Sequence, residues 1–200
     1  MAASVTLQQL GLTAAEGRNP AITGIAVDSR EVQAGFLFAA LPGSKVHGGE
    51  FIQYALRMDA GAILTDAVGA EIAADELANS DAAIIVTDDP RSALAFASAL
   101  YFGAQPQIMT AVTGTNGKTS VSTFVRQIWN LLDLEAVNLG TTGVEGSLHL
   151  PLAHTTPEPI TLHRTLATLV HEGISHAAME ASSHGLHQRR LDGVNLAAAG

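Results

Sequence analysis

The residues of this sequence most evidently suited to chemistry are the eight from Thr113 to Ser120, which read Thr-Gly-Thr-Asn-Gly-Lys-Thr-Ser. They lie between an apolar stretch and an amphipathic one, where a strand is expected to give way to a helix. At such a junction, backbone N–H groups and the helix N-terminus face an anion, a lysine can reach the outer phosphates and a threonine hydroxyl can ligate Mg²⁺. The stretch therefore predicts a phosphate-binding loop. It is shorter than the usual pattern, because two residues instead of four separate Gly114 from Gly117-Lys118.

A second candidate for holding Mg²⁺ is Glu180, which ends the short apolar stretch Ser175–Met179. A carboxylate at the end of a strand beside the phosphate loop can hold the cation directly or through water. Two other polar segments, Asp28–Arg30 and Gly43–Gly48, also follow predicted strands, where open α/β sheets place their ligands. Taken alone, both of these segments are ordinary turn sequences.

Two other kinds of chemistry are not expected. His184 and His187 are three residues apart, but there is no His-Glu-x-x-His sequence and no cysteine, so a zinc site is improbable. Ser182 is not surrounded by the Gly-x-Ser-x-Gly sequence of a nucleophilic serine. Arg190 is a better candidate for binding a pyrophosphate than for a solvated surface role.

The composition places the chain among globular α/β proteins. Of its 200 residues, 47% are hydrophobic, and none is cysteine. The net charge is −9 with only ten lysines and arginines, which argues against a nucleic-acid partner. No apolar run reaches the roughly 18 residues that a membrane span requires. We therefore expect a cytoplasmic enzyme, and a monomer.

Alternating strand and helix patterns predict two domains. The first, residues 1–105, is a small α/β domain, and the second, residues 106–200, has a mostly parallel sheet. Strands are expected at 22–27, 36–41, 62–64, 82–86, 108–112, 135–139, 175–179 and 194–199, and helices at 5–12, 51–58, 89–101, 121–132 and 160–171. The 121–132 helix is expected to bury a broad apolar face that includes Trp129, and 146–152 to form a hairpin off the main sheet. The last strand lacks further neighbours, so the second domain looks truncated.

Together these motifs resemble the Mur ligases and their relatives, the folylpolyglutamate and cyanophycin synthetases, whose ATP-binding signature has the short form seen at 114–119. Three further stretches narrow the resemblance: Asp28–Arg30 followed by 35–43, then Thr155–Glu158, then Met179–Leu186. In this order they are similar to the MurE-type members of the family. Those members add the third residue of the peptidoglycan stem peptide to UDP-N-acetylmuramoyl-L-alanyl-D-glutamate.

The resemblance, which runs from about residue 22 to 200, implies an ATP-dependent ligase with Mg²⁺ as cofactor. Its substrates would be the UDP-N-acetylmuramoyl-dipeptide and a diamino acid, either meso-diaminopimelate or L-lysine. ATP would phosphorylate the terminal carboxylate to an acyl phosphate, which the amine then attacks. The implied ATP-binding residues are Gly114, Thr115, Asn116, Gly117, Lys118, Thr119 and Ser120, with Lys118 and Glu180 catalytic and Thr119 and Glu180 at the metal. The implied substrate-binding residues are Val27, Ser29, Ser44, Lys45, Val46, Thr155, Thr156, Ser182, Gln188 and Arg190.

Two positions depart from the family pattern. His154 stands where an asparagine commonly precedes the two threonines, and His47 where an aspartate commonly precedes Gly48. The family's carbamylated lysine and its amino-acid-selecting domain would lie beyond Gly200, so we expect these 200 residues alone to show no ligase turnover. Two other interpretations stay open: another ligase of the superfamily, and a non-catalytic nucleotide-binding module.

Overall fold

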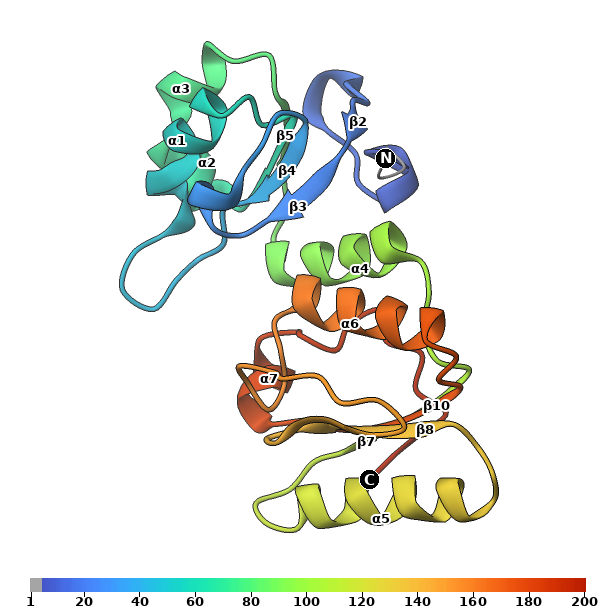
Figure 1. Ribbon diagram of the computed structural model, residues 1–200. Coiled ribbons are helices and arrows are strands. Elements are labelled where there is room, and N and C mark those ends of the chain that lie inside the picture. The colour runs from blue at the N-terminus through green and yellow to red at the C-terminus, as the bar shows by residue number, and fades with distance from the viewer. Residues whose placement is uncertain (1–4) are drawn as a thin grey trace. The chain divides into compact units, whose positions relative to one another are not determined.

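The structure is a computed structural model that describes residues 5–200, and the chain divides into two compact units (Figure 1). The first unit ends at Tyr101, and the second is Phe102–Gly200. Each has its own parallel sheet, which confirms the predicted α/β fold class. Within the described part of the chain, no helix is both long enough and apolar enough to cross a membrane.

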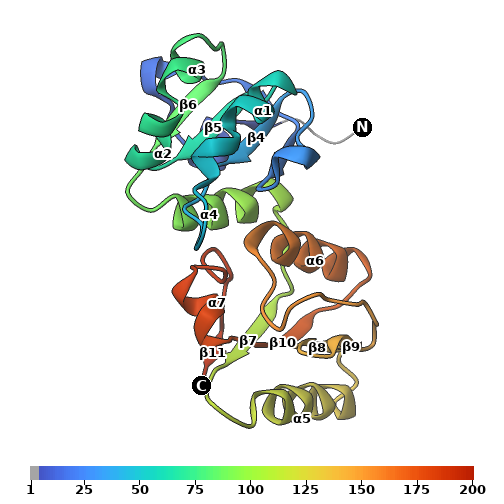
Figure 2. The ribbon, with the colours of Figure 1, turned by 90° about the vertical axis from the view of Figure 1, so that its left-hand side faces the viewer.

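The first unit is built on four parallel strands that follow one another in sequence order: β3 (Gly24–Ala26), β4 (Phe36–Ala39), β5 (Ala62–Thr65) and β6 (Ala83–Val86). Between them lie η3 (Ser29–Glu31), η4 (Gly48–Phe51), α1 (Ile52–Arg57), α2 (Ala67–Ile72) and α3 (Ala74–Ala78), and α4 (Pro90–Phe102) follows (Figures 1 and 2). Phe38 and Ile63 on the sheet pack with Ile52 of α1 and Leu77 of α3 in one core. The carboxyl ends of all four strands therefore meet at one edge of the sheet.

The start of the described chain differs from the prediction. Instead of a helix over 5–12, it forms β1 (Val5–Thr6), which pairs with β2 (Ala21–Ile22), followed by the short turns η1 (Gln8–Leu10) and η2 (Ala15–Gly17). One reason is local: the Gln9 side chain accepts a hydrogen bond from the Thr6 N–H at 2.8 Å, which competes with helical bonding. The predicted strand 22–27 is likewise split at Thr23 between two sheets. Helices α2 and α3 were not predicted.

The second unit has a five-stranded sheet in the order β11 (Ala198–Ala199), β7 (Ile108–Val112), β10 (His176–Glu180), β8 (Ala136–Gly140) and β9 (Gly143–Gly146). Only β9 is antiparallel to its neighbour. Helix α5 (Lys118–Leu131) covers one face and α6 (Pro159–His171) the other (Figure 1), and α7 (Ser183–His187) follows β10. The main core lies beneath α6, where Leu162, Leu166 and Leu169 pack on alternate residues of the strands.

Two expectations for the second unit were wrong. The 121–132 helix forms, but its apolar stripe points outward: Phe124 is 59% exposed, Ile128 57% and Leu131 83%, and Trp129 is only partly buried. The sheet beneath α5 presents the polar Asn138, so the helix packs through small residues such as the fully buried Ser122. The expected hairpin off the sheet is instead β9, which pairs with β8 and completes the main sheet.

Candidate functional site

The phosphate-loop sequence connects β7 directly to α5. Gly114 and Gly117 have φ values of 134° and 82°, which glycine adopts without the penalty that a side chain would carry. Residues 113–117 are exposed, and the loop is therefore open to a ligand. Lys118 is the first residue of the helix, and its Nζ donates to the Gly114 carbonyl oxygen at 2.7 Å, which places the ammonium group across the loop.

Glu180 lies at the carboxyl end of β10, the strand between β7 and β8. It is 1% exposed, and its Oε1 accepts hydrogen bonds from the Thr119 hydroxyl at 2.9 Å and from the Thr141 backbone N–H at 3.0 Å. The adjacent Gly140 leaves room for the carboxylate, because a Cβ there would lie 1.9 Å from Oε1. Strand register thus brings together the first turn of α5, the end of β10 and the turn after β8.

The donors present here fit a magnesium ion. Mg²⁺ prefers oxygen ligands and is usually held by one or two protein groups together with waters and substrate phosphates. The Thr119 hydroxyl and the Glu180 carboxylate are two such oxygens in direct contact. Across residues 5–200 no group of three or more His, Cys, Asp or Glu side chains could hold a metal ion. The protein's share of a magnesium site in this unit would therefore be Thr119 and Glu180.

The predicted substrate residues of the second unit gather beside Glu180. The Thr155 hydroxyl lies 3.0 Å from that of Thr141, whose own backbone bonds Glu180. The Thr156 hydroxyl is buried; it donates to the Glu180 carbonyl oxygen and accepts from the Ser182 N–H, both at 3.0 Å. The Thr155-Thr156 segment is thereby fixed to the end of β10.

Arg190 reaches the same segment from the turn after α7. Its Nη1 donates to the Thr156 carbonyl oxygen at 2.7 Å, and its Nη2 donates to Gln188 Oε1 at 2.6 Å. These contacts orient the guanidinium group. Ser182 begins α7, and its Oγ accepts from the Gly185 N–H at 3.1 Å. All five predicted substrate residues of this unit therefore lie in one connected network.

In the first unit, Val27 and Ser29 line a cavity of about 680 Å³ at the carboxyl end of β3. Its other lining residues are Asp28, Arg30, Phe51 and Tyr54. The volume falls within the range of small-molecule sites. Asp28 accepts two hydrogen bonds from the Arg30 Nε and Nη2 atoms, and this side-chain contact lowers the pKa of Asp28 to about 2.

Sequence reasoning missed three of the residues that now belong to these sites. Thr141 directly follows a strand that neighbours β10, and that position was the signal that could have identified it. Phe51 and Tyr54 fit the apolar pattern of a predicted helix and were therefore assigned to the core, yet they are 41% and 50% exposed beside the cavity.

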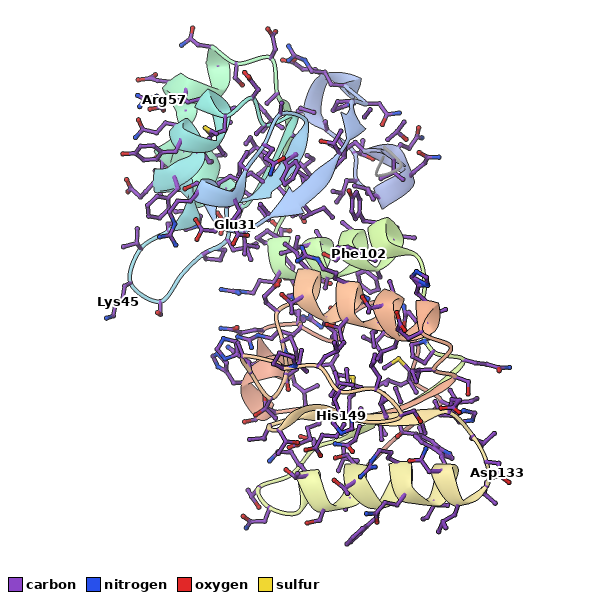
Figure 3. The ribbon with its side chains drawn as sticks, in the orientation of Figure 1. Glu31, Lys45, Arg57, Phe102, Asp133 and His149 are labelled. Carbon is purple, nitrogen blue, oxygen red and sulfur yellow. The ribbon has the colours of Figure 1, made fainter. Side chains whose placement is uncertain are left out.

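Ser44, Lys45 and Val46 do not line this cavity. They are exposed in the loop between β4 and η4, and Lys45 projects from the tip of that loop (Figure 3). The structure therefore places Val27 and Ser29 in one cavity and the other three predicted residues of the unit on a separate loop at the same edge of the sheet. His47, one of the two departures from the family pattern, ends this loop.

These features define a class of protein: a parallel α/β protein with a phosphate loop and a buried carboxylate at the carboxyl edge of its second sheet. Residues 112–199 match the Mur ligase middle domain, and residues 21–102 match the domain described as Mur ligase family, catalytic domain. The chain belongs to the Mur ligase family, as the sequence motifs predicted.

Individual relatives narrow the comparison. The UDP-N-acetylmuramoyl-L-alanyl-D-glutamate–2,6-diaminopimelate ligase of Brucella melitensis is 54% identical over 180 residues, which cover 88% of this chain and 35% of that protein. The ligase of the same name from Mesorhizobium japonicum is 46% identical over 186 residues, 90% of this chain and 36% of the relative. The chain thus spans about a third of the length of these curated relatives.

Solved structures agree with this. A structure of a UDP-N-acetylmuramoyl-L-alanyl-D-glutamate–2,6-diaminopimelate ligase matches 98% of this chain and 40% of its own, with a TM-score of 0.77 and 27% identity. A structure of MurF from Acinetobacter baumannii, 20% identical with a TM-score of 0.56, covers 90% of this chain and 36% of its own. At that identity, the second match supports the fold alone.

Proposed function

We propose that this chain carries the ATP-binding and UDP-substrate-binding residues of an ATP-dependent amide ligase. The ligase would act as a cytoplasmic monomer and add a diamino acid, with meso-diaminopimelate favoured over L-lysine, to UDP-N-acetylmuramoyl-L-alanyl-D-glutamate. The observation that carries the proposal is the contact between Thr119 and Glu180 beside the phosphate loop. The relatives support the substrates, because their names state this dipeptide and 2,6-diaminopimelate.

In this proposal the backbone N–H groups of 114–119 and the Lys118 ammonium bind the phosphates of ATP. Thr119 and Glu180 hold Mg²⁺, which supplies charge neutralisation between two anions, the γ-phosphate and the substrate carboxylate. A carboxylate oxygen attacks the γ-phosphorus and ADP leaves. The amine nitrogen then attacks the acyl carbon, phosphate leaves, and an amide remains after the nitrogen loses a proton. The protein contributes positioning and charge compensation rather than a covalent intermediate of its own.

The remaining predicted residues would bind the UDP-linked substrate. Thr155 and Arg190 lie beside Glu180, where they can bring a second anionic substrate to the phosphate. In the first unit, the cavity lined by Val27 and Ser29 would take the uridine end, and the exposed rings of Phe51 and Tyr54 offer flat apolar surface to a base.

The test is Lys118→Ala, made in a protein that carries the full length of the relatives. We expect ADP release that depends on both the UDP-dipeptide and the diamino acid to fall by at least about 100-fold, as when one stabilising charge is removed from a transition state. Lys45→Ala is a matched control, because Lys45 is the one other lysine in the sequence and lies on the exposed loop of the first unit. It should spare kcat. Near-normal turnover by Lys118→Ala would overturn the assignment.

A further inference from the structure

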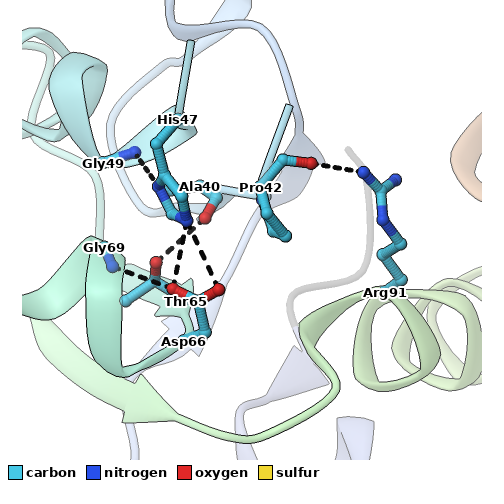
Figure 4. A network of polar contacts seen from close by, with 8 residues as sticks. All are labelled: Ala40, Pro42, His47, Gly49, Thr65, Asp66, Gly69 and Arg91. Carbon is cyan, nitrogen blue, oxygen red and sulfur yellow. Dashed lines mark hydrogen bonds and ion pairs between the residues drawn. The ribbon is translucent and has the colours of Figure 1, made fainter. Parts of the chain in front are cut away.

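The loop from Gly43 to Val46 is exposed, but both of its ends are held by other elements (Figure 4). Before the loop, the Ala40 carbonyl oxygen accepts from the Thr65 hydroxyl at 2.9 Å, and the Pro42 carbonyl oxygen accepts from Arg91 of α4. After the loop, the Gly48 N–H donates to the Leu41 carbonyl oxygen at 2.8 Å. Four exposed residues are thus suspended between fixed points.

His47 is the last residue before the second fixed point, and its ring makes two hydrogen bonds. Nδ1 accepts from the Gly49 N–H at 2.9 Å, which begins η4. An accepting Nδ1 carries a lone pair, so in the neutral ring the proton sits on Nε2. Nε2 lies 3.1 Å from Asp66 Oδ1 and 3.3 Å from Oδ2, in position to donate.

Asp66 already has a structural task. Its Oδ1 accepts from the Gly69 N–H at 2.8 Å, which begins α2. Burial raises the pKa of Asp66, but the hydrogen bonds from Gly69 and His47 outweigh it and leave the pKa below its ordinary value. The pair of His47 and Asp66 therefore joins the starts of η4 and α2 through a carboxylate that stays ionised.

The ring is also closely packed. A Cβ on Gly69 would lie 2.7 Å from His47 Cε1, and a Cβ on Gly49 would lie 2.9 Å from Gly69 Cα. Glycine at both positions lets the ring sit between the two helix starts. An aspartate at position 47, the residue common in the family, would instead place a second carboxylate beside Asp66, where like charges repel.

We propose that His47 and Asp66 are a positioning pair that holds the Gly43–Val46 loop in the conformation in which it contacts the nucleotide end of the substrate. The inference rests on the proposed function, because it takes Ser44, Lys45 and Val46 to bind that end. A loop that is held before binding loses less conformational freedom on binding. Neither residue touches the substrate; both act through the loop.

The test compares His47→Asp, Asp66→Asn and the double variant in the full-length protein. His47→Asp should raise the KM for the UDP-dipeptide about tenfold, which corresponds to the ordering of one or two loop side chains, with kcat and the KM for ATP unchanged. The double variant should return KM to within about threefold, because the amide at 66 can cap Gly69 and donate to the carboxylate at 47. His149→Asp, at an exposed histidine of the second unit, is the matched control.

A second readout does not depend on catalysis. In the ligand-free 200-residue chain, the imidazole nitrogens of His47 should show the Nε2–H tautomer by NMR. Amide hydrogen exchange over 43–46 should speed up in His47→Asp and recover in the double variant. Unchanged exchange would overturn the proposal. Faster exchange with an unchanged KM for the UDP-dipeptide would also overturn it, while the ligase assignment would be judged by Lys118→Ala. A general loss of folding would lower kcat and is excluded by recovery in the double variant.

Discussion

The carboxylate of Glu180 depends on a residue with no side chain. Gly140 faces it across neighbouring strands, and a methyl group there would lie 1.9 Å from Oε1. We expect Gly140→Ala to displace the carboxylate from Thr119, because the backbone of a central strand cannot move freely. Magnesium-dependent ATP binding should weaken tenfold or more, and the free energy of unfolding should fall by about 1–3 kcal/mol. Isothermal titration calorimetry and urea unfolding of the 200-residue chain measure the two effects.

A control for this prediction separates ligand binding from stability. Gly173 follows α6 with a φ of 82°, and a Cβ there would meet no atom within 4 Å. Gly173→Ala should therefore cost about 1 kcal/mol through backbone strain alone and leave ATP binding unchanged. Wild-type affinity in Gly140→Ala would show that the Thr119–Glu180 contact does not hold the metal.

A second residue-scale prediction concerns Asp28, whose pKa the Arg30 guanidinium lowers from 3.8 to about 2. Because the folded-state pKa is depressed, the stabilisation from this pair is present above pH 3.8 and is lost as the pH falls through about 2. Arg30→Gln should move the pKa of Asp28 back toward 3.8, measured by a ¹³C NMR titration of its carboxyl carbon. Arg57→Gln is the control, because that guanidinium lies over Tyr54. An unchanged pKa of Asp28 in Arg30→Gln would show that the guanidinium is not what lowers it.

Residue types identified the phosphate loop and Glu180 because these positions have a spacing or a strand end that a sequence displays. Thr141 could not be found in the same way, because its contact with Glu180 comes from the pairing of β8 with β10. The order of strands in a sheet is a long-range property that local patterns do not contain. His47 shows the same limit: its sequence neighbours predict a turn, whereas its partner Asp66 lies 19 residues away.

At the scale of elements, α5 shows what periodicity predicts and what it does not. The spacing of Phe124, Ile128 and Leu131 correctly predicted a helix and a single apolar stripe. It could not predict which side would face the sheet, because that depends on the polar Asn138 beneath the helix. The prediction that apolar residues face the core succeeded for α6, whose leucines meet the apolar residues of the opposite sheet face.

The outward stripe leads to a stability prediction. Phe124→Gln and Leu131→Gln should each change the free energy of unfolding by no more than about 0.5 kcal/mol, because both side chains are already solvated. Leu166→Ala, in the core under α6, should cost about 2–5 kcal/mol. The single tryptophan of the chain, Trp129, lies on α5 and reports the unfolding of the second unit by fluorescence in urea. A loss above about 2 kcal/mol in Phe124→Gln, more than a surface substitution causes, would mean that another part of the protein covers the stripe.

At the scale of the whole molecule, the chain has two compact units, each with its own parallel sheet and with candidate ligand residues at the carboxyl ends of its strands. The proposed function assigns ATP to the second unit and the uridine end to the first. A ligand that binds only the folded form of a unit slows local opening around its site by mass action. The two nucleotides should therefore protect different segments of the same chain.

Hydrogen exchange measured by mass spectrometry on the 200-residue chain tests this division. Magnesium ATP should slow exchange over 113–120 and 139–142, where the loop and the Glu180 partners lie. Uridine monophosphate, which lacks the second phosphate and the muramoyl group, should instead slow exchange over 27–30 and 43–54, next to the cavity and the held loop. Lys118→Ala should abolish the first pattern and keep the second. Protection of the first unit by ATP, or of the phosphate loop by uridine monophosphate, would mean that the ligands have been assigned to the wrong units.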